Sequence, residues 1–390
     1  MSAEIPLVTA AVALAIWVYL IVARGDFWRT QKFDDLAPAP GFMNWPPIAV
    51  VVPARDEAAG VGACVTSILS QPYPGALSMI LVDDQSQDGT SQIASEAAAK
   101  IGASDRLTVL QGRPLPSGWT GKLWAVKQGL TLVESSATQP EYVLLTDADI
   151  VYSGDVLMRL VARAQNEKLA MTSIMAKLRC ESLAEKYLIP AFIFFFGMLY
   201  PFGWVRSRTR ATGAAAGGCI LARWDALKNA GGIDAIRGSL IDDCALGVRL
   251  KTQGPVWLGF SQNVVSVRAS DTVGDVGQMI SRSAYAQLHY SLALLIGTIF
   301  AMTIVFLAPV LISLFGHGLA AVFAAAAWLL MALAFQPTLR YYGQSALWGP
   351  ALPAIAVAYM VFTVNSAIQH FQGRGGMWKG RAQAQVSSSQ

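Results

Sequence analysis

The sequence has little charge for its 390 residues: only 14% are Asp, Glu, Lys or Arg, whereas 54% are hydrophobic. Its mean hydropathy is +0.44. An ordinary soluble domain of this length is more polar, so the composition excludes a purely soluble protein. The net charge of +4 is modest and does not indicate a nucleic-acid-binding protein. It is compatible with an anionic membrane surface and with anionic substrates.

Histidine and cysteine are also scarce, with three and four residues respectively. The four cysteines lie far apart and form no CxxC pair, and two of the histidines lie at or in apolar segments. This scarcity argues against a zinc site. Widely spaced cysteines suit a reduced cytoplasmic domain.

Long apolar runs, in contrast, are present at both ends of the chain. Residues 5–23 form a run long enough to cross a bilayer, and Arg24, Arg29 and Lys32 follow it. In a signal peptide the basic residues would precede the apolar run. We therefore predict an uncleaved transmembrane anchor over 1–24, with the bulk of the chain in the cytoplasm.

The C-terminal part is predicted to hold transmembrane helices over 286–370. Two spans fit within 291–336, interrupted near 316–318, and a third covers 347–369. Three spans would place the basic tail, 371–390, outside, whereas the positive-inside rule favours a cytoplasmic tail. Either one span is re-entrant or the number of spans differs by one.

The middle of the chain, 45–285, has the patterning of one α/β domain. Short apolar runs alternate with helical stretches, which predicts a mainly parallel sheet. Strands are expected over 48–52 (ended by Pro53), 79–82, 107–110 and 142–145, and helices over 58–70, 90–101 and 121–133.

An aromatic, apolar segment over 188–204 lies inside this domain and contains Pro190 and Pro201. We expect it to lie on the membrane surface or to line a channel for a lipid acceptor, rather than to cross the membrane. A buried core helix is the alternative.

Acidic residues follow three of the predicted strands. In parallel α/β sheets ligands bind at the carboxyl ends of the strands, so these clusters predict one composite site. Carboxylate oxygens completed by substrate phosphates are the usual ligands of Mg²⁺ or Mn²⁺, although paired aspartates can also cap a helix. The clusters contain Asp56 and Glu57, then Asp83 and Asp84, then Asp147 and Asp149.

Three later motifs complete the candidate site. Lys122 follows two glycines at the start of a predicted helix, where it can meet phosphate, and the spacing does not match a Walker A loop. Gly217 and Gly218 let the backbone approach a ligand closely. Asp242 and Asp243 begin an amphipathic helix, where acids either complement the helix dipole or provide a general base.

In this order the motifs resemble those of family 2 glycosyltransferases with the GT-A fold, which is a Rossmann-like, mainly parallel sheet. The resemblance covers about 50–255. More narrowly, the chain resembles the bacterial hopene-associated glycosyltransferases. That resemblance rests on 118–129, 176–185 and 236–243, which read GWTGKLWAVKQG, AKLRCESLAE and IRGSLIDD, and it extends to 378–381.

The resemblance implies a nucleotide-diphosphate sugar donor, usually UDP-linked, and a divalent metal, Mg²⁺ or Mn²⁺. It implies that Asp147 and Asp149 hold the metal, with Asp149 the more direct ligand, and that Asp243 is the base. Asp242 stands where the family usually has Glu, as the partner of that base. The implied donor-binding residues are Pro53, Glu57, Asp83, Asp84, Lys122, Asp147, Gly217, Gly218 and Arg282.

One base without a second nucleophilic carboxylate predicts inversion, and the apolar ends of the chain predict a multi-pass membrane enzyme with a lipid acceptor. The resemblance implies the bacterial inner membrane and suggests a hopanoid as the acceptor. Processive synthases of the family carry a Gln-x-x-Arg-Trp motif. Here 278–285 reads QMISRSAY, without the tryptophan and with different spacing, which favours transfer of a single sugar. The alternatives are a processive polysaccharide synthase, a membrane nucleotidyl- or sugar-phosphate transferase, and a non-enzymatic transporter or scaffold.

Overall fold

The computed structural model describes residues 4–30 and 45–382, and within them eight strands form one mixed, mostly parallel sheet. The order is β3-β2-β1-β4-β7-β6-β8-β5, with β7 antiparallel to both of its neighbours and β5 antiparallel to β8. The strands are β1 (Ile48–Ala54), β2 (Leu77–Asp83), β3 (Leu107–Gln111), β4 (Tyr142–Leu145), β5 (Ile150–Tyr152), β6 (Met171–Lys177), β7 (Ile220–Arg223) and β8 (Val256–Ser266).

The predicted α/β fold class is confirmed, and each strand and helix expected in the first half of the domain is present. One boundary prediction is wrong, because β1 continues through Pro53 to Ala54. β4 pairs with β1 only as far as Val51. Beyond Val51, β1 has no hydrogen-bonded neighbour among the described strands on the β4 side. Because Pro53 lies in that part of the strand, its missing N–H removes no strand-to-strand hydrogen bond on the β4 side.

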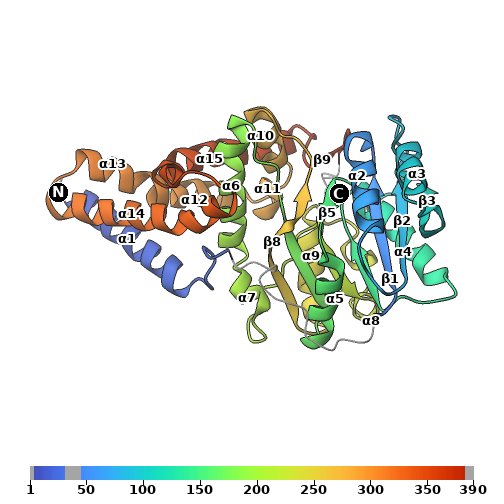
Figure 1. The fold of residues 1–390 in the computed structure, drawn as a ribbon. Helices are drawn as coiled ribbons and strands as arrows, with labels where there is room; N and C mark the ends of the chain where they lie inside the picture. Colours follow the sequence, from blue (N-terminus) through green and yellow to red (C-terminus); the bar gives the residue numbers. More distant parts are fainter. Residues whose placement is uncertain (1–3, 31–44, 383–390) are drawn as a thin grey trace.

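Helices cover both faces of the first half of the sheet (Figure 1). Val50 and Val52 of β1 pack with α2, α3 and α5, whereas Val51 packs with α4. Alternate residues of a strand point to opposite faces, so a wholly apolar strand is buried on both. The helices are α2 (Ala58–Leu69), α3 (Thr90–Lys100), α4 (Gly121–Ser135) and α5 (Val156–Asn166).

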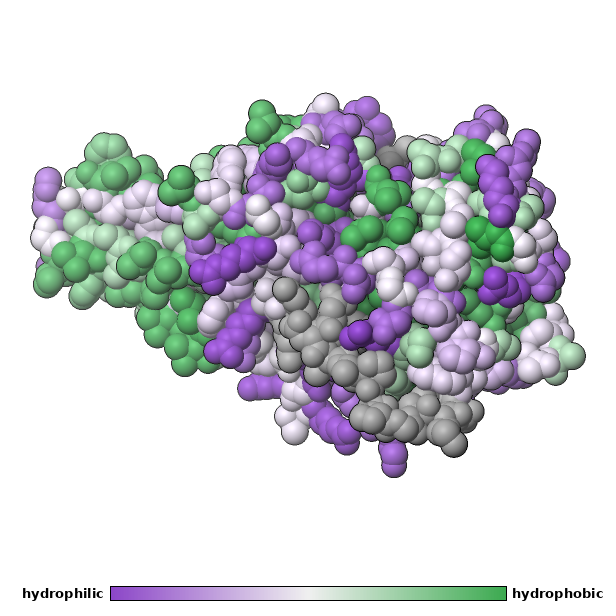
Figure 2. Space-filling view, viewed as in Figure 1, coloured by the Kyte–Doolittle hydropathy of each residue, from purple (hydrophilic) through white to green (hydrophobic). Residues whose placement is uncertain are grey.

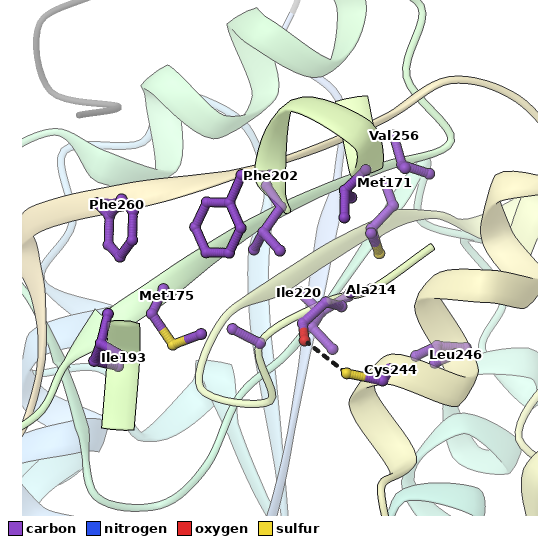
Figure 3. Close-up of a cluster of buried hydrophobic side chains, with 14 of the residues drawn as sticks. Met171, Met175, Ile193, Phe202, Ala214, Ile220, Cys244, Leu246, Val256 and Phe260 are labelled. Atoms are coloured by element: carbon purple, nitrogen blue, oxygen red, sulfur yellow. Dashed lines mark hydrogen bonds between the residues drawn. The ribbon is translucent and has the colours of Figure 1, made fainter. Parts of the chain in front are cut away.

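The second half of the sheet is covered on one face by a cluster of buried side chains (Figure 3). Met171 and Met175 of β6 and Phe260 of β8 contribute to it, and the rings of Phe202 and Phe260 stack at 4.8 Å. Cys244 closes the cluster and lies 3.9 Å from the Ala215 carbonyl oxygen. Its helix, α9 (Asp242–Lys251), is thereby held against the sheet with its N-terminus at the candidate site.

The segment over 188–204 forms most of α6 (Leu183–Leu199) and the short α7 (Phe202–Arg206). Ser182 and Glu185 form a capping box at the start of α6. The helix then packs on the apolar C-terminal helices: the Phe194 and Phe335 rings lie 5.2 Å apart, and the Tyr359 hydroxyl donates to the Leu188 carbonyl. α6 therefore joins the α/β domain to the apolar helices, and its placement at a membrane surface stays a prediction.

Four of the described helices are long and apolar enough to cross a membrane. α1, α13 and α14 project from one end of the α/β domain, and hydrophobic residues cover that end (Figures 1 and 2). The break expected near 316–318 is present, while Lys32 and the tail from 383 onward lie outside the described residues. The first is α1 (Glu4–Ala23). The second is the continuous run of α12 (Leu292–Met302), η3 (Thr303–Leu307) and α13 (Ala308–Phe315). The third is α14 (Gly318–Tyr341), and the fourth is η4 (Ala346–Ala351) with α15 (Leu352–Phe371).

Short elements connect these parts. They are η1 (Ser104–Arg106), α8 (Trp224–Asn229), η2 (Asp234–Ile236), α10 (Val273–Ser281), α11 (Ala284–Gln287), β9 (Met377–Trp378) and β10 (Arg381–Ala382).

Candidate active site

The acidic clusters meet at one edge of the sheet, as expected from the parallel pairing of β1 with β2 and β4. Two backbone bonds join the strand ends: Asp84 N–H donates to the Ala54 carbonyl at 2.8 Å, and Thr146 N–H donates to the Val51 carbonyl at 3.3 Å. The loops after β1, β2 and β4 therefore form a single rim.

The two carboxylates after β2 form hydrogen bonds and an ion pair with other residues of the protein. Asp83 accepts hydrogen bonds from Ser86 N–H at 2.8 Å and from the Ser91 hydroxyl. Asp84 is buried and lies 3.6 Å from the Arg55 guanidinium. Both residues thus order the loops at the ends of β1 and β2.

Lys122 joins two of the predicted motifs. Its ammonium lies 2.9 Å from Asp147 Oδ1 and 3.2 Å from Asp242 Oδ2. Burial alone would lower the pKa of Lys122, but the two carboxylates raise it above its usual range, so the side chain stays charged. Burial raises the pKa of Asp147, and Lys122 opposes that rise. The Gly-Lys loop therefore brings a fixed cation beside the Asp-x-Asp pair.

Asp243 is held by two backbone N–H groups. Gly217 N–H donates to its Oδ2 at 3.0 Å, and Cys244 N–H donates to its Oδ1 at 2.7 Å. Burial and the neighbouring Asp242 raise the pKa of Asp243 to about 6. A carboxylate with such a pKa is mostly ionised at neutral pH and more basic than an ordinary aspartate, as a general base requires.

Gly217 lies at the centre of the cluster. A Cβ at this position would lie 3.2 Å from Lys122 Nζ, 3.6 Å from Asp243 Oδ2 and 3.7 Å from Asp147 Oδ2. The same residues, together with Pro53, line a small cavity. Gly218 is not among the residues that line this cavity. Its carbonyl accepts a hydrogen bond from the Thr146 hydroxyl at 2.7 Å.

Asp149 belongs to a second charged group, which the sequence motifs did not reveal. Its Oδ2 accepts from the Ser266 hydroxyl at 2.7 Å and from Arg268 Nε at 3.2 Å. The same guanidinium donates to Glu57 Oε1 at 2.6 Å. Ser266 pairs with Ile150 at the end of β8, so a basic residue just beyond this long strand is the signal that would have indicated Arg268.

The residues present fit a divalent cation whose coordination is completed by substrate. Within residues 4–30 and 45–382, no three His, Cys, Asp or Glu side chains form a metal-binding group. Asp147 and Asp149 supply hard oxygen donors, and such donors, completed by substrate phosphates, are how Mg²⁺ and Mn²⁺ are usually held. The chemistry of the pair therefore suits these metals and not zinc.

Arg282 is not part of the cluster formed by the other predicted residues. It ends α10, which packs against α6 and α15. Among the described residues, no hydrogen bond or ion pair joins its side chain to the carboxylates of the site. Its predicted contact with a diphosphate stays a prediction.

A methyl group at residue 217 is expected to disturb the site without unfolding the protein. In Gly217→Ala the added Cβ crowds the Lys122 ammonium and fills the space between it and the carboxylates of Asp243 and Asp147, so we expect kcat/KM for sugar transfer to fall about 10–100-fold. Transfer kinetics and the thermal midpoint of the purified protein would be measured together. Gly297→Ala is the matched control, because its Cβ meets nothing within 4 Å. Equal kinetics for the two variants would contradict the placement of Gly217.

The sheet topology and the acidic strand ends define an α/β enzyme of the GT-A type. A family model described as "Glycosyltransferase like family 2" matches residues 46–269, more than half of the chain, and the protein therefore belongs to this family of glycosyltransferases. The match does not distinguish hopene-associated members, so that finer resemblance stays a prediction. No curated protein matches the chain.

One solved structure shows the same fold, and a second is similar with a lower TM-score. The mannosyltransferase PcManGT from Pyrobaculum calidifontis, in complex with GDP-Man and Mn²⁺, is similar over 94% of this chain and 99% of its own, with 19% identity and a TM-score of 0.54. Mannosyl-3-phosphoglycerate synthase from Rubrobacter xylanophilus is similar over 69% of this chain and 83% of its own, with 17% identity and a TM-score of 0.41. At such identities the likeness concerns the fold alone.

Proposed function

We propose that this glycosyltransferase is a membrane-bound, inverting enzyme that moves a sugar from a nucleotide-diphosphate sugar, UDP-linked, to the hydroxyl group of a lipid. A hopanoid is the proposed acceptor, and the cytoplasmic membrane of a bacterium the proposed location, with the catalytic domain in the cytoplasm. The observation that carries the proposal is the cluster in which Lys122, Asp147 and Asp243 converge on Gly217.

The donor side of this cluster suits a diphosphate. Asp147 and Asp149 would hold the divalent metal, Mg²⁺ or Mn²⁺, and the solved mannosyltransferase of the same fold contains Mn²⁺. When bound, the metal neutralises charge that develops on the departing diphosphate. Lys122 adds a fixed positive charge at the same place. Glu57, Asp83 and Asp84 line the rim on the side proposed for the nucleoside.

Asp243 is proposed to take the proton from the acceptor hydroxyl. As the acceptor oxygen forms its bond to the anomeric carbon, the bond from that carbon to the diphosphate breaks, and its electron pair leaves with the nucleoside diphosphate. The backbone donors at Gly217 and Cys244 orient the carboxylate for this step. A single base without a nucleophilic carboxylate implies inversion at the anomeric carbon.

A lipid acceptor is supported by the way in which the domain meets the apolar helices. α6 packs against α10, α14 and α15, so the catalytic domain is joined along this helix to the apolar part of the molecule. An acceptor that stays in the membrane would reach such an enzyme by lateral diffusion. The family match favours glycosyl transfer over the nucleotidyltransferase, transporter and scaffold alternatives.

The test is an assay of the purified full chain in lipid, with UDP- and GDP-sugars and a hopanoid or another hydroxylated lipid. The expected products are a nucleoside diphosphate and a lipid glycoside of inverted anomeric configuration. Release of pyrophosphate or a nucleoside monophosphate, or growth of a long polymer, would contradict the proposal. Lipid analysis of a deletion strain, in which one glycolipid should be missing, would identify the acceptor.

A further inference from the structure

The C-terminal tail contacts the loop after β1, far away in sequence. Lys379 Nζ lies 3.2 Å from Glu57 Oε1 and donates a hydrogen bond of 2.9 Å to the Asp56 carbonyl. The Lys379 carbonyl in turn accepts from Arg55 Nε at 3.3 Å. Three polar contacts therefore fix the tail to the rim of the candidate donor site.

The local backbone presents Lys379 at the tip of a hairpin. β9 and β10 pair antiparallel, and the two residues between them, Lys379 and Gly380, have φ values of 45° and 81°. Two successive left-handed residues are typical of a type I′ turn. Gly380 adopts this conformation freely, but a lysine does so at a cost, which indicates that its position is determined by its contacts.

The charge of Lys379 is linked to the Asp-x-Asp pair. Lys379 and Arg268 both form ion pairs with Glu57 Oε1, and Arg268 also forms an ion pair with Asp149. The Glu57 side chain is only 11% exposed, so two cations compensate a largely desolvated carboxylate. Loss of one of them would alter how Glu57 and Arg268 are held.

The path of the chain explains how the tail reaches this rim. α14 ends against the sheet, where the Tyr341 hydroxyl donates to the Ser261 carbonyl at 2.6 Å. The chain then turns back along α14, and Trp328 Nε1 donates to the Pro350 carbonyl at 3.0 Å. Trp328 lies thirteen residues before Tyr341, about 20 Å along the helix axis. A bilayer core is about 30 Å thick, so this limb does not cross it.

α15 then returns to the catalytic domain. Ser366, near its end, donates to the Ser281 carbonyl and accepts from Tyr285 N–H at 3.0 Å. Figure 1 accordingly draws β9 over the α/β domain and not at the tip of the helical projection. On this path, of the described apolar helices, α1, α12–α13 and α14 would cross the membrane, and the basic tail would lie on the side that the positive-inside rule favours.

We propose that Lys379 is a positioning residue of the donor site. A re-entrant segment, Ala346–Phe371, returns Lys379 to the catalytic side of the membrane. The proposal rests on the proposed function in one respect, namely that the rim at Glu57 receives the nucleoside diphosphate. Lys379 acts through Glu57, and its contribution is to binding of the donor rather than to the chemical step.

The first experiment compares Lys379→Ala, Lys379→Arg and Arg374→Ala in the full-length protein. Arg374 is an exposed cation of the same tail and controls for loss of charge. In Lys379→Ala we expect the KM for the nucleotide sugar, and the Kd for nucleoside diphosphate, to rise about tenfold, because a charged hydrogen bond is lost, while kcat stays within about twofold. Lys379→Arg should restore both. Equal values for Lys379→Ala and Arg374→Ala, or a loss confined to kcat, would overturn the proposal.

The second experiment tests the path of the chain without any assumption about activity. Single cysteines replace Arg374, Lys100 of α3 and His317, which lies between α13 and α14, in a Cys180→Ser background. A membrane-impermeant maleimide is applied to sealed vesicles of each orientation. We expect Arg374→Cys to react from the same side as Lys100→Cys and opposite to His317→Cys. Reaction together with His317→Cys would show a fourth crossing and overturn the re-entrant path, whatever the acceptor is.

Discussion

Asp243→Asn is expected to lower kcat for sugar transfer by about 10²–10⁴-fold, the range typical of a lost general base. The amide keeps the size of the side chain, and its single oxygen can still accept from one of the two N–H groups, Gly217 or Cys244, that bond different oxygens of the carboxylate. It cannot take a proton from an acceptor hydroxyl. Donor binding should therefore persist, and titration of nucleoside diphosphate would verify this beside the transfer assay.

The pH dependence gives an independent reading of the same residue. Because the pKa of Asp243 is raised to about 6, the carboxylate is lost as the pH falls through that value. We expect kcat/KM of the wild type to be level above about pH 6 and to fall tenfold per pH unit below it. Asp242→Asn is the matched control, since it removes the neighbouring charge and should shift this profile to lower pH. Near-normal transfer by Asp243→Asn would show that the base lies elsewhere.

Asp149→Asn is expected to cost about 10²–10³-fold in kcat, because stabilisation of the charge on the departing diphosphate is commonly worth this much. It should also remove the strengthening of nucleoside diphosphate binding by Mn²⁺. Asn keeps one oxygen that can accept from Ser266 but has no charge to hold a metal or Arg268. Binding titrations with and without Mn²⁺ separate the metal effect from the chemical step.

Asp155→Asn provides the matched control for Asp149→Asn. Asp155 is a partly exposed aspartate whose side-chain partner is Arg159, four residues later, and not a residue of the site. We expect its kinetics and metal dependence to equal those of the wild type. If wild-type binding of the nucleoside diphosphate proves insensitive to Mg²⁺ and Mn²⁺, the metal role of Asp149 is wrong, and its ion pair with Arg268 is its observed electrostatic contact.

The strands and helices of the first half of the domain can be predicted from the sequence for a simple physical reason. Strands buried on both faces need continuous apolar runs, and such runs end where polar residues begin. Parallel pairing then brings the strand ends to one edge. The sequence alone therefore groups Asp147 and Asp149 with the acidic loops after β1 and β2. The order of the motifs adds Lys122 and Asp243 to this group.

Arg268 and Lys379 could not be grouped in this way. They reach Glu57 across 211 and more than 300 residues of sequence, and neither follows a strand of the predicted parallel sheet. The motif at 378–381 carries a family resemblance but does not indicate where Lys379 lies in the fold. Arg268 is placed by pairing of β8 with β5, and Lys379 by the return of α15. Both depend on which strands and helices become neighbours.

The sequence by itself determined that the chain is an α/β glycosyltransferase with apolar helices at its ends, because composition, apolar runs and ordered acidic motifs are local properties. The tertiary structure alone decided which cations meet the site carboxylates and where Ala346–Phe371 lies. Hydropathy is the same for a helix that crosses a membrane and for one that dips into it and returns. The proposed re-entrant path of Ala346–Phe371 therefore rests on the contacts of Tyr341, Pro350 and Ser366.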